Sequence, residues 1–371
     1  MKKHKLMKKF LITIAAILLI CGIGIFALMK IVGNFIGSEH APVADYDKRI
    51  EIWNTVAGNN SRSKLEDMNI DYDENIMGAT FAFIKAIVNT EYADAECIID
   101  TFTYLYEIKG GYEKESYEDM PYLIPYMVED SKGAVIVIPG GGYGYKSMDG
   151  STGEGKDIAL TLNQHGYSAF VLHYRSNPYE YPIPQLDVQR AVRYLRANAE
   201  KYGFDPENIA LIGFSAGGNQ VGSYINLIMG NNLFPEDYTP DAIDVINDSV
   251  QAAGMIYPAL SYNVNVPMLF CSFSDKLVRD EVKRSQLLLN MDLSQQFNSE
   301  EIPQLVSYGT SDGMVGMDES KKYIEVAREN GADITEIVAE GQDHGFGQQF
   351  YMDEFVLLLN RAFDGIQTEN P

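Results

Sequence analysis

One serine stands in a glycine-flanked motif that could make it a nucleophile. Residues Gly213–Gly218 read Gly-Phe-Ser-Ala-Gly-Gly and fit the pattern G-x-S-x-G. An apolar run at 208–212 precedes the motif, and helix-like residues follow it at 219–229. A sharp strand-to-helix turn needs glycines at its flanks, and it lifts the serine hydroxyl clear of the sheet at the positive end of a helix. The motif predicts Ser215 as a nucleophile, although alone it also fits a glycine-rich turn capped by a serine.

A second glycine-rich segment could stabilise an oxyanion. Residues Pro139–Tyr143 read Pro-Gly-Gly-Gly-Tyr and follow the apolar run 134–138 directly. Acyl transfer places negative charge on an oxygen of the tetrahedral intermediate, and backbone N–H groups held in place stabilise it. Because glycines let the backbone approach closely, we expect Gly141 and Gly142 to donate, together with the N–H of Ala216. A phosphate-binding loop is disfavoured, since the segment lacks the spacing of both common phosphate motifs.

A general base and an acid must accompany the serine. Of the five histidines, His344 is the best candidate, because it lies in a glycine-rich loop after the apolar run 334–339. Asp312 follows the preceding apolar run, so its loop should neighbour the loop of the histidine. Asp275 and Asp343 remain alternatives, since Asp275 follows another apolar run in the same chain order and Asp343 adjoins the histidine.

The elements that must position these residues begin near residue 117, where short apolar runs alternate with helix-like stretches. Strands are predicted at 122–128, 134–138, 168–174, 208–213, 252–257, 304–308 and 334–339, and helices near 154–165, 185–201, 216–229, 317–330 and 350–364. This alternation predicts an α/β fold with a mostly parallel central sheet and helices on both faces. Active sites of such sheets lie at the carboxyl ends of the strands, where the motifs fall.

The preceding part of the chain carries no catalytic motif. Residues 35–112 show helix-like apolar spacing at 45–58 and 75–106. We therefore expect a helical extension or cap there. The chain would then divide into a basic tip with a membrane segment at 1–34, this extension, and a catalytic domain at 113–371.

An uncharged run of 20 residues, Phe10–Met29, predicts a transmembrane signal anchor. As a helix it would span ~30 Å, the thickness of a bilayer core. Residues 1–34 hold six lysines and no acid, with five of the lysines before the run. The positive-inside rule then predicts a cytoplasmic N-terminus and an extracytoplasmic catalytic domain. The alternative is a cleaved signal peptide and a secreted protein, but the run is longer than such signals usually carry.

Composition limits the classes of partner. The chain has 371 residues and a net charge of −23, so a nucleic-acid partner is disfavoured, because phosphate binding needs basic patches. Three cysteines are too few for a disulfide scaffold. Cys97 and Cys271 could pair outside the cell, but we expect both to be small core residues. The sequence does not determine an oligomeric state.

Taken together, the motifs resemble the α/β-hydrolase superfamily, in its esterase/lipase branch, and especially the acetylxylan-esterase-like and feruloyl-esterase-like groups. The resemblance covers about residues 117–350. It implies a serine carboxylesterase in which Ser215 attacks, His344 acts as base and Asp312 orients the histidine, with no metal or organic cofactor. Many relatives have a histidine before the glycines, where this chain has Pro139.

Three functions compete. The first is an esterase acting on short-acyl or carbohydrate esters. The second is a serine peptidase of the same fold, which Ala216 and the triple glycine disfavour. The third is an inactive surface-binding protein, which would not need an intact set of serine, aspartate and histidine.

For the substrate, Tyr143 and Tyr145 could stack against a sugar or an aromatic acyl group, and Arg175 could bind a carboxylate. Alternatively, tyrosines in these loops, including Tyr174, cover the shoulders of the domain, and the arginine pairs with one of the many surface acids. The long connections 230–251 and 259–303 could cap the site.

Overall fold

The computed structural model describes residues 22–27, 29, 43–58, 120–144, 146–148, 153–176, 179–263 and 266–364. The chain divides into two compact units. The first comprises Met1–His40 and Asn69–Tyr112, and the second comprises Ala41–Met68 and Glu113–Pro371.

In the first unit, residues 22–27 and 29 are helical. Within the described part of the chain, no helix is both long and apolar enough to cross a bilayer. Most of the predicted anchor, the predicted helix at 75–106 and Cys97 lie outside the described residues. The anchor therefore stays a prediction.

The second unit is built on an eight-stranded sheet among the described residues. The order is β1-β2-β4-β3-β5-β6-β7-β8; β1 and β4 pair antiparallel with β2, and the remaining pairs are parallel. The strands are β1 (Ile50–Glu51), β2 (Tyr122–Tyr126), β3 (Ala134–Ile138), β4 (Ser168–His173), β5 (Ile209–Phe214), β6 (Ala252–Ile256), β7 (Gln304–Gly309) and β8 (Ile334–Ala339). Strands β2 to β8 confirm the seven predicted ones.

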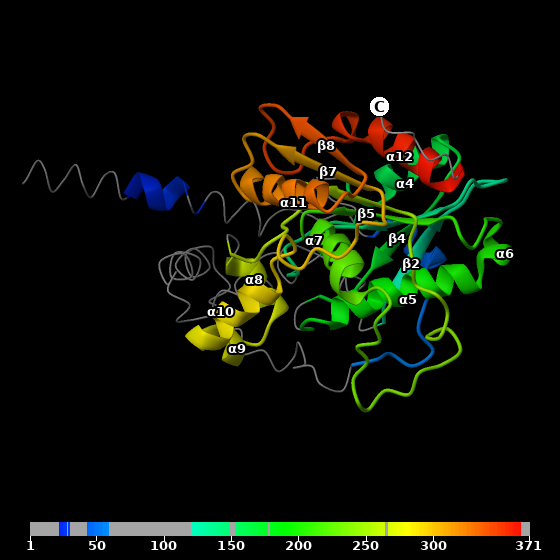
Figure 1. The fold of residues 1–371 in the computed structure, drawn as a ribbon, viewed down its shortest axis with the longest axis horizontal. Helices are drawn as coiled ribbons and strands as arrows, with labels where there is room; N and C mark the ends of the chain where they lie inside the picture. Colours follow the sequence, from blue (N-terminus) through cyan, green and yellow to red (C-terminus); the bar gives the residue numbers. More distant parts are fainter. Residues whose placement is uncertain are drawn as a thin grey trace, which may run out of the picture. The chain divides into compact units, whose positions relative to one another are not determined.

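Helices cover both faces of this sheet, as predicted (Figure 1). One face carries α4 (Lys156–Gln164) and α12 (Met352–Asp364). The other carries α5 (Ile183–Ala197), α7 (Ala216–Ser223) and α11 (Met317–Glu329). Strand β3 is buried along its whole length, which explains its unbroken run of apolar and mostly β-branched residues.

Further helices complete the unit. They are η1 (Tyr46–Lys48), α6 (Ala199–Tyr202), the π-helical η6 (Tyr224–Ile228), α8 (Val266–Ser272), α9 (Asp275–Arg279), α10 (Glu281–Asn290) and η7 (Gln348–Phe350). Helices α8, α9 and α10 lie within the predicted connection 259–303. The apolar run before Asp275 therefore belongs to a helix, because a short apolar run fits either element equally well.

The predicted helix at 45–58 is wrong. Residues 43–58 instead form η1 and the edge strand β1, in which Ile50 pairs with Leu123 of β2. Contacts with the sheet unit prevail over the local helix-like spacing, since Ile52 and Trp53 are buried there. This segment thus packs as part of the sheet unit.

Candidate active site

Ser215 stands at the sharp turn between β5 and α7. Its backbone angles, φ 52° and ψ −115°, are strained for a residue other than glycine. A Cβ at Gly217 would lie 2.1 Å from the carbonyl oxygen of Ile138, so only glycine lets the first turn of α7 approach β3. The serine therefore sits where the helix begins, at the positive end of the helix dipole.

The three residues predicted for chemistry lie in one hydrogen-bonded chain. Nε2 of His344 is 2.9 Å from Oγ of Ser215, and Nδ1 of the same ring is 2.8 Å from Oδ2 of Asp312. The aspartate side chain is 2% exposed and the histidine side chain 14%. This arrangement can pass a proton from the hydroxyl to the imidazole while the carboxylate holds the ring.

Asp312, and not the alternative Asp343, contacts the histidine ring. Its second oxygen, Oδ1, accepts the N–H groups of Met314 at 2.9 Å and Val315 at 2.8 Å. These bonds orient the carboxylate before any substrate arrives. Asp275 begins α9.

Asp343 ties two loops together instead of binding the ring. Its Oδ1 accepts the N–H of Gly313 at 3.0 Å and the N–H of His344 at 2.8 Å. These hydrogen bonds, that of Gly313 foremost, lower the pKa of the Asp343 carboxyl. The loop after β8 is thereby joined to the loop after β7, which carries Asp312.

The predicted oxyanion loop runs beside the serine. Gly141 has φ 124° and Gly142 has φ 62°, conformations that favour glycine. A Cβ added at Gly140 would lie 2.9 Å from Cβ of Ser215. Among the described residues, no acceptor takes the N–H of Gly141, of Gly142 or of Ala216. These groups can therefore donate to a bound ligand.

Two further residues connect this loop to the histidine, and sequence reasoning missed both. Oε2 of Glu154 accepts the N–H of Gly140 at 2.8 Å, and Oε1 accepts the hydroxyl of Tyr257 at 2.9 Å. The Tyr257 ring packs edge-on against His344, with ring centroids 4.9 Å apart. Burial raises the pKa of Glu154 and raises that of Tyr257 well above its usual range. Glu154 is a lone acid between two glycines, and no sequence signal marks it as buried.

The model of the BD-FAE family matches residues 122–326, which is more than half of the chain. The chain belongs to the BD-FAE family. Its fold is that of the α/β hydrolases: a solved structure titled acetyl ester-xyloside bifunctional hydrolase, from Caldicellulosiruptor lactoaceticus, aligns with a TM-score of 0.56 at 25% identity. That alignment covers 66% of this chain and 88% of the other.

Two curated relatives of this BD-FAE chain carry esterase names. An acetylxylan esterase of Xylanibacter ruminicola is 36% identical over 98 residues, which is 26% of this chain and 20% of the relative. The esterase LipC of Mycobacterium tuberculosis is 25% identical over 220 residues, covering 57% of this chain and 52% of the relative. The chain thus spans about half the length, or less, of these relatives.

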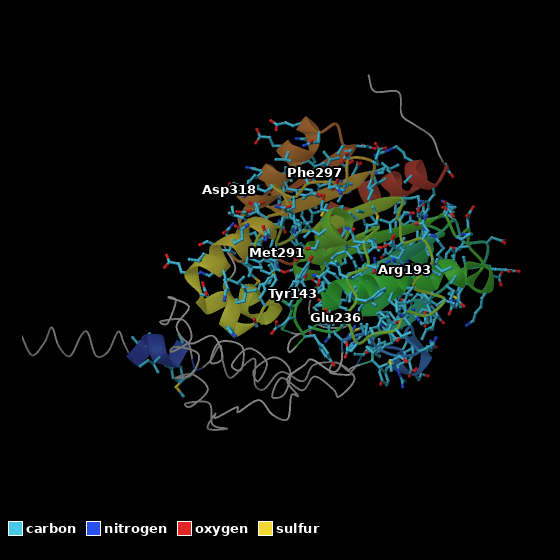
Figure 2. All side chains as sticks on the ribbon, turned by 60° about the horizontal axis from the view of Figure 1, so that its bottom comes forward. Tyr143, Arg193, Glu236, Met291, Phe297 and Asp318 are labelled. Carbon is cyan, nitrogen blue, oxygen red and sulfur yellow. The ribbon has the colours of Figure 1, made fainter. Side chains whose placement is uncertain are left out.

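The prediction that Tyr143 stacks on substrate is wrong for this BD-FAE chain. Its ring is 1% exposed, and its hydroxyl donates to Oδ1 of Asn219 at 2.7 Å. Figure 2 labels Tyr143 among closely packed side chains. Tyr174 is also buried, and its hydroxyl donates to the Pro139 carbonyl at 2.9 Å. Both tyrosines support the glycine loop from inside, while Tyr145 lies outside the described residues.

The prediction that Arg175 binds a substrate carboxylate is also wrong. The residue is 1% exposed. Its Nε donates to Oδ2 of Asp187 at 2.9 Å and its NH2 group to Oδ1 at 2.6 Å. Arg175 does pair with an acid, but the partner is the buried Asp187 and not the predicted surface acid. A buried, two-pronged ion pair of this kind holds the guanidinium in the interior.

Proposed function

We propose that this protein is a serine esterase that hydrolyses carboxylic esters through an acyl-enzyme. The observation that carries the proposal is the hydrogen-bonded chain from Asp312 through His344 to Ser215. Membership of the BD-FAE family and the esterase names of the curated relatives support it. The strained serine, set between a helix N-terminus and the glycine loop, supports a nucleophile held ready for attack.

In the first half of the reaction, Oγ of Ser215 attacks the ester carbonyl carbon while Nε2 of His344 takes the hydroxyl proton. The carbonyl oxygen becomes an oxyanion and accepts the N–H groups of Gly141, Gly142 and Ala216. The tetrahedral intermediate then breaks its bond to the alcohol oxygen. That oxygen leaves with the proton of the imidazolium, and the acyl group stays on the serine.

In the second half, His344 takes a proton from water as the water oxygen attacks the acyl carbonyl. The intermediate expels Oγ of Ser215, which recovers its proton from the imidazolium, and a carboxylic acid is released. Asp312 keeps the N–H of the imidazole at Nδ1, so that Nε2 accepts the proton, and it stabilises the imidazolium in both halves.

We infer that short-acyl esters of carbohydrates are the substrates. One relative is named acetylxylan esterase, and the structural relative is named an acetyl ester-xyloside bifunctional hydrolase. We also propose that residues 10–29 anchor the enzyme, with the catalytic domain outside the cytoplasm. Carbonate extraction tests this: the full chain should stay in the membrane pellet, and its release would contradict an anchor.

The activity is tested with the full chain purified in a mild detergent. Hydrolysis of p-nitrophenyl acetate and butyrate is compared with that by Ser215→Ala and by the control Ser311→Ala, a serine on a neighbouring loop. We expect kcat to fall by roughly 10⁴-fold or more in Ser215→Ala and to be kept in the control. Equal rates in the parent and in Ser215→Ala would contradict the proposal.

An active parent is then assayed on acetylated xylo-oligosaccharides and on peptide p-nitroanilides. Acetate release from the sugars is the expected result. Cleavage of the anilides without acetate release from the sugars would favour the peptidase instead.

A further inference from the structure

One buried carboxylate beside the reacting residues has no role in the mechanism above. Glu154 is 3% exposed and lies just before α4, next to the reacting residues. Burying an acid is unfavourable unless hydrogen bonds compensate, and here each oxygen accepts one donor. The two donors belong to separate parts of the site: the glycine loop and the residue that packs on the histidine.

The first donor is the N–H of Gly140, which immediately precedes the proposed oxyanion donors Gly141 and Gly142. A Cβ at Gly140 would meet both Cβ of Ser215 at 2.9 Å and Oε2 of Glu154 at 3.1 Å. Carboxylate, loop and serine therefore form one packed set. The peptide that leads into the oxyanion loop is held by the carboxylate directly.

The second donor is the hydroxyl of Tyr257, which follows β6. The N–H of Tyr257 donates to the carbonyl of Ser307 at 2.6 Å, which fixes the backbone to β7. Its ring lies 4.9 Å from the His344 ring and 5.0 Å from the ring of Phe346, measured between centroids. The His344 ring thus packs against a tyrosine whose hydroxyl is hydrogen-bonded to Glu154.

We propose that Glu154 is a positioning residue for ester hydrolysis. Its carboxylate holds the Gly140–Gly142 loop against Ser215 and, through Tyr257, holds the ring of His344. The role rests on the proposed esterase function. Because the oxyanion and the imidazolium both develop in the transition state, misplacing their supports should lower kcat more than it raises KM.

The test uses the full chain and four variants. Glu154→Leu keeps most of the side-chain volume but accepts from neither donor. Glu154→Gln can still accept from Gly140 and can donate its amide N–H to the tyrosine oxygen. Tyr257→Phe removes one of the two hydrogen bonds, the one from the tyrosine hydroxyl to Glu154. Tyr308→Phe is the matched control, because Tyr308 is also buried and donates to a glutamate, Glu336, at 2.6 Å.

For each variant, kcat and KM are measured with p-nitrophenyl acetate, together with Tm and the rate of inactivation by a p-nitrophenyl phosphonate. We expect kcat in Glu154→Leu to fall roughly 10- to 100-fold, less than the loss of an oxyanion donor, with KM changed by less than about threefold. Phosphonate inactivation should slow in parallel. Glu154→Gln should recover most of the loss, Tyr257→Phe should lose less than Glu154→Leu, and Tyr308→Phe should lower Tm while keeping the parental kcat.

A parental kcat in folded Glu154→Leu would overturn the proposal, as would an equal loss in Tyr308→Phe. If Glu154→Leu does not fold, Glu154→Gln and Tyr257→Phe decide. A reduced kcat in Tyr257→Phe supports the role, and parental values in both overturn it. A parent no more active than Ser215→Ala would overturn the esterase function together with this role, whereas an active parent with unaffected Glu154 variants overturns this role alone.

Discussion

Nε2 of His344 lies 2.9 Å from Oγ of Ser215, although 129 positions of sequence separate the two residues. Ser215 follows β5 and His344 follows β8, with β6 and β7 between these strands in the sheet. The loop after β8 must therefore reach back across two strands. Tyr257, which follows β6, contacts the histidine ring, and Asp312, which follows β7, binds it. Each intervening strand thus contributes one support.

Replacing Asp312 tests its role in orienting the histidine. Asp312→Asn keeps the shape of the side chain but removes the charge that fixes the imidazole tautomer. We expect kcat on p-nitrophenyl acetate to fall by roughly 10³- to 10⁴-fold while Tm stays close to that of the parent. Asp275→Asn is the matched control and should keep the parental kcat. A large loss in Asp275→Asn with little loss in Asp312→Asn would reverse the assignment.

Segment 43–58 should contribute to the stability of the sheet unit. Trp53 is 4% exposed, its Nε1–H donates to Asp187 at 3.1 Å, and the Arg190 guanidinium lies 4.8 Å from its ring centre. We expect Trp53→Ala to lower the free energy of unfolding by about 3–5 kcal/mol, and Trp53→Phe by less. Denaturant unfolding followed by circular dichroism measures this. A parental midpoint in Trp53→Ala would show that the segment does not stabilise the sheet unit.

Acid should weaken the contact of this segment with the rest of its unit. Two guanidinium nitrogens of Arg190 donate to Asp241 at 2.6 and 2.8 Å, and Asn54 donates to the same carboxylate at 2.9 Å. The hydrogen bonds from Arg190, above all, lower the pKa of Asp241. The unfolded chain therefore binds a proton at higher pH than the folded chain does. This contribution to stability is present above about pH 4 and is lost as pH falls further.

Asp241→Asn tests whether this contribution to stability is lost as pH falls. The Tm of the variant should lie below that of the parent at about pH 7, and the gap should narrow towards about pH 3. Asp333→Asn is the control, because Asp333 is 54% exposed and lies 3.8 Å from Arg361, too weak a pair to matter. A gap between Asp241→Asn and the parent that stays constant with pH would contradict the assignment.

The elements and the reacting residues could be predicted because they depend on local patterns. Four apolar runs of the sheet are each followed directly by a motif, and Asp312 was selected over Asp275 because it follows the last strand before the histidine loop. To bring the motifs together, the prediction then needed only the rule that parallel strands place their carboxyl ends at one edge of the sheet. The segment 45–58 failed the same kind of prediction, because pairing with β2 outweighed its helix-like spacing.

Burial is what the sequence did not reveal. Tyr143 and Arg175 have side chains typical of binding sites, yet both turn inward, because Asn219 and Asp187 offer them buried partners. The Glu154–Tyr257 pair joins residues 103 positions apart, and neither lies in a recognisable motif. Contacts of that range follow from packing between elements, which no local pattern encodes.

The most direct measurement is covalent labelling of the serine. The full chain is treated with a fluorophosphonate, and the modified site is located by peptide mass spectrometry. An activated nucleophile predicts one adduct per chain, on Ser215, with labelling slowed by several orders of magnitude in His344→Ala. Labelling at another serine, or an equal rate in His344→Ala, would contradict the account.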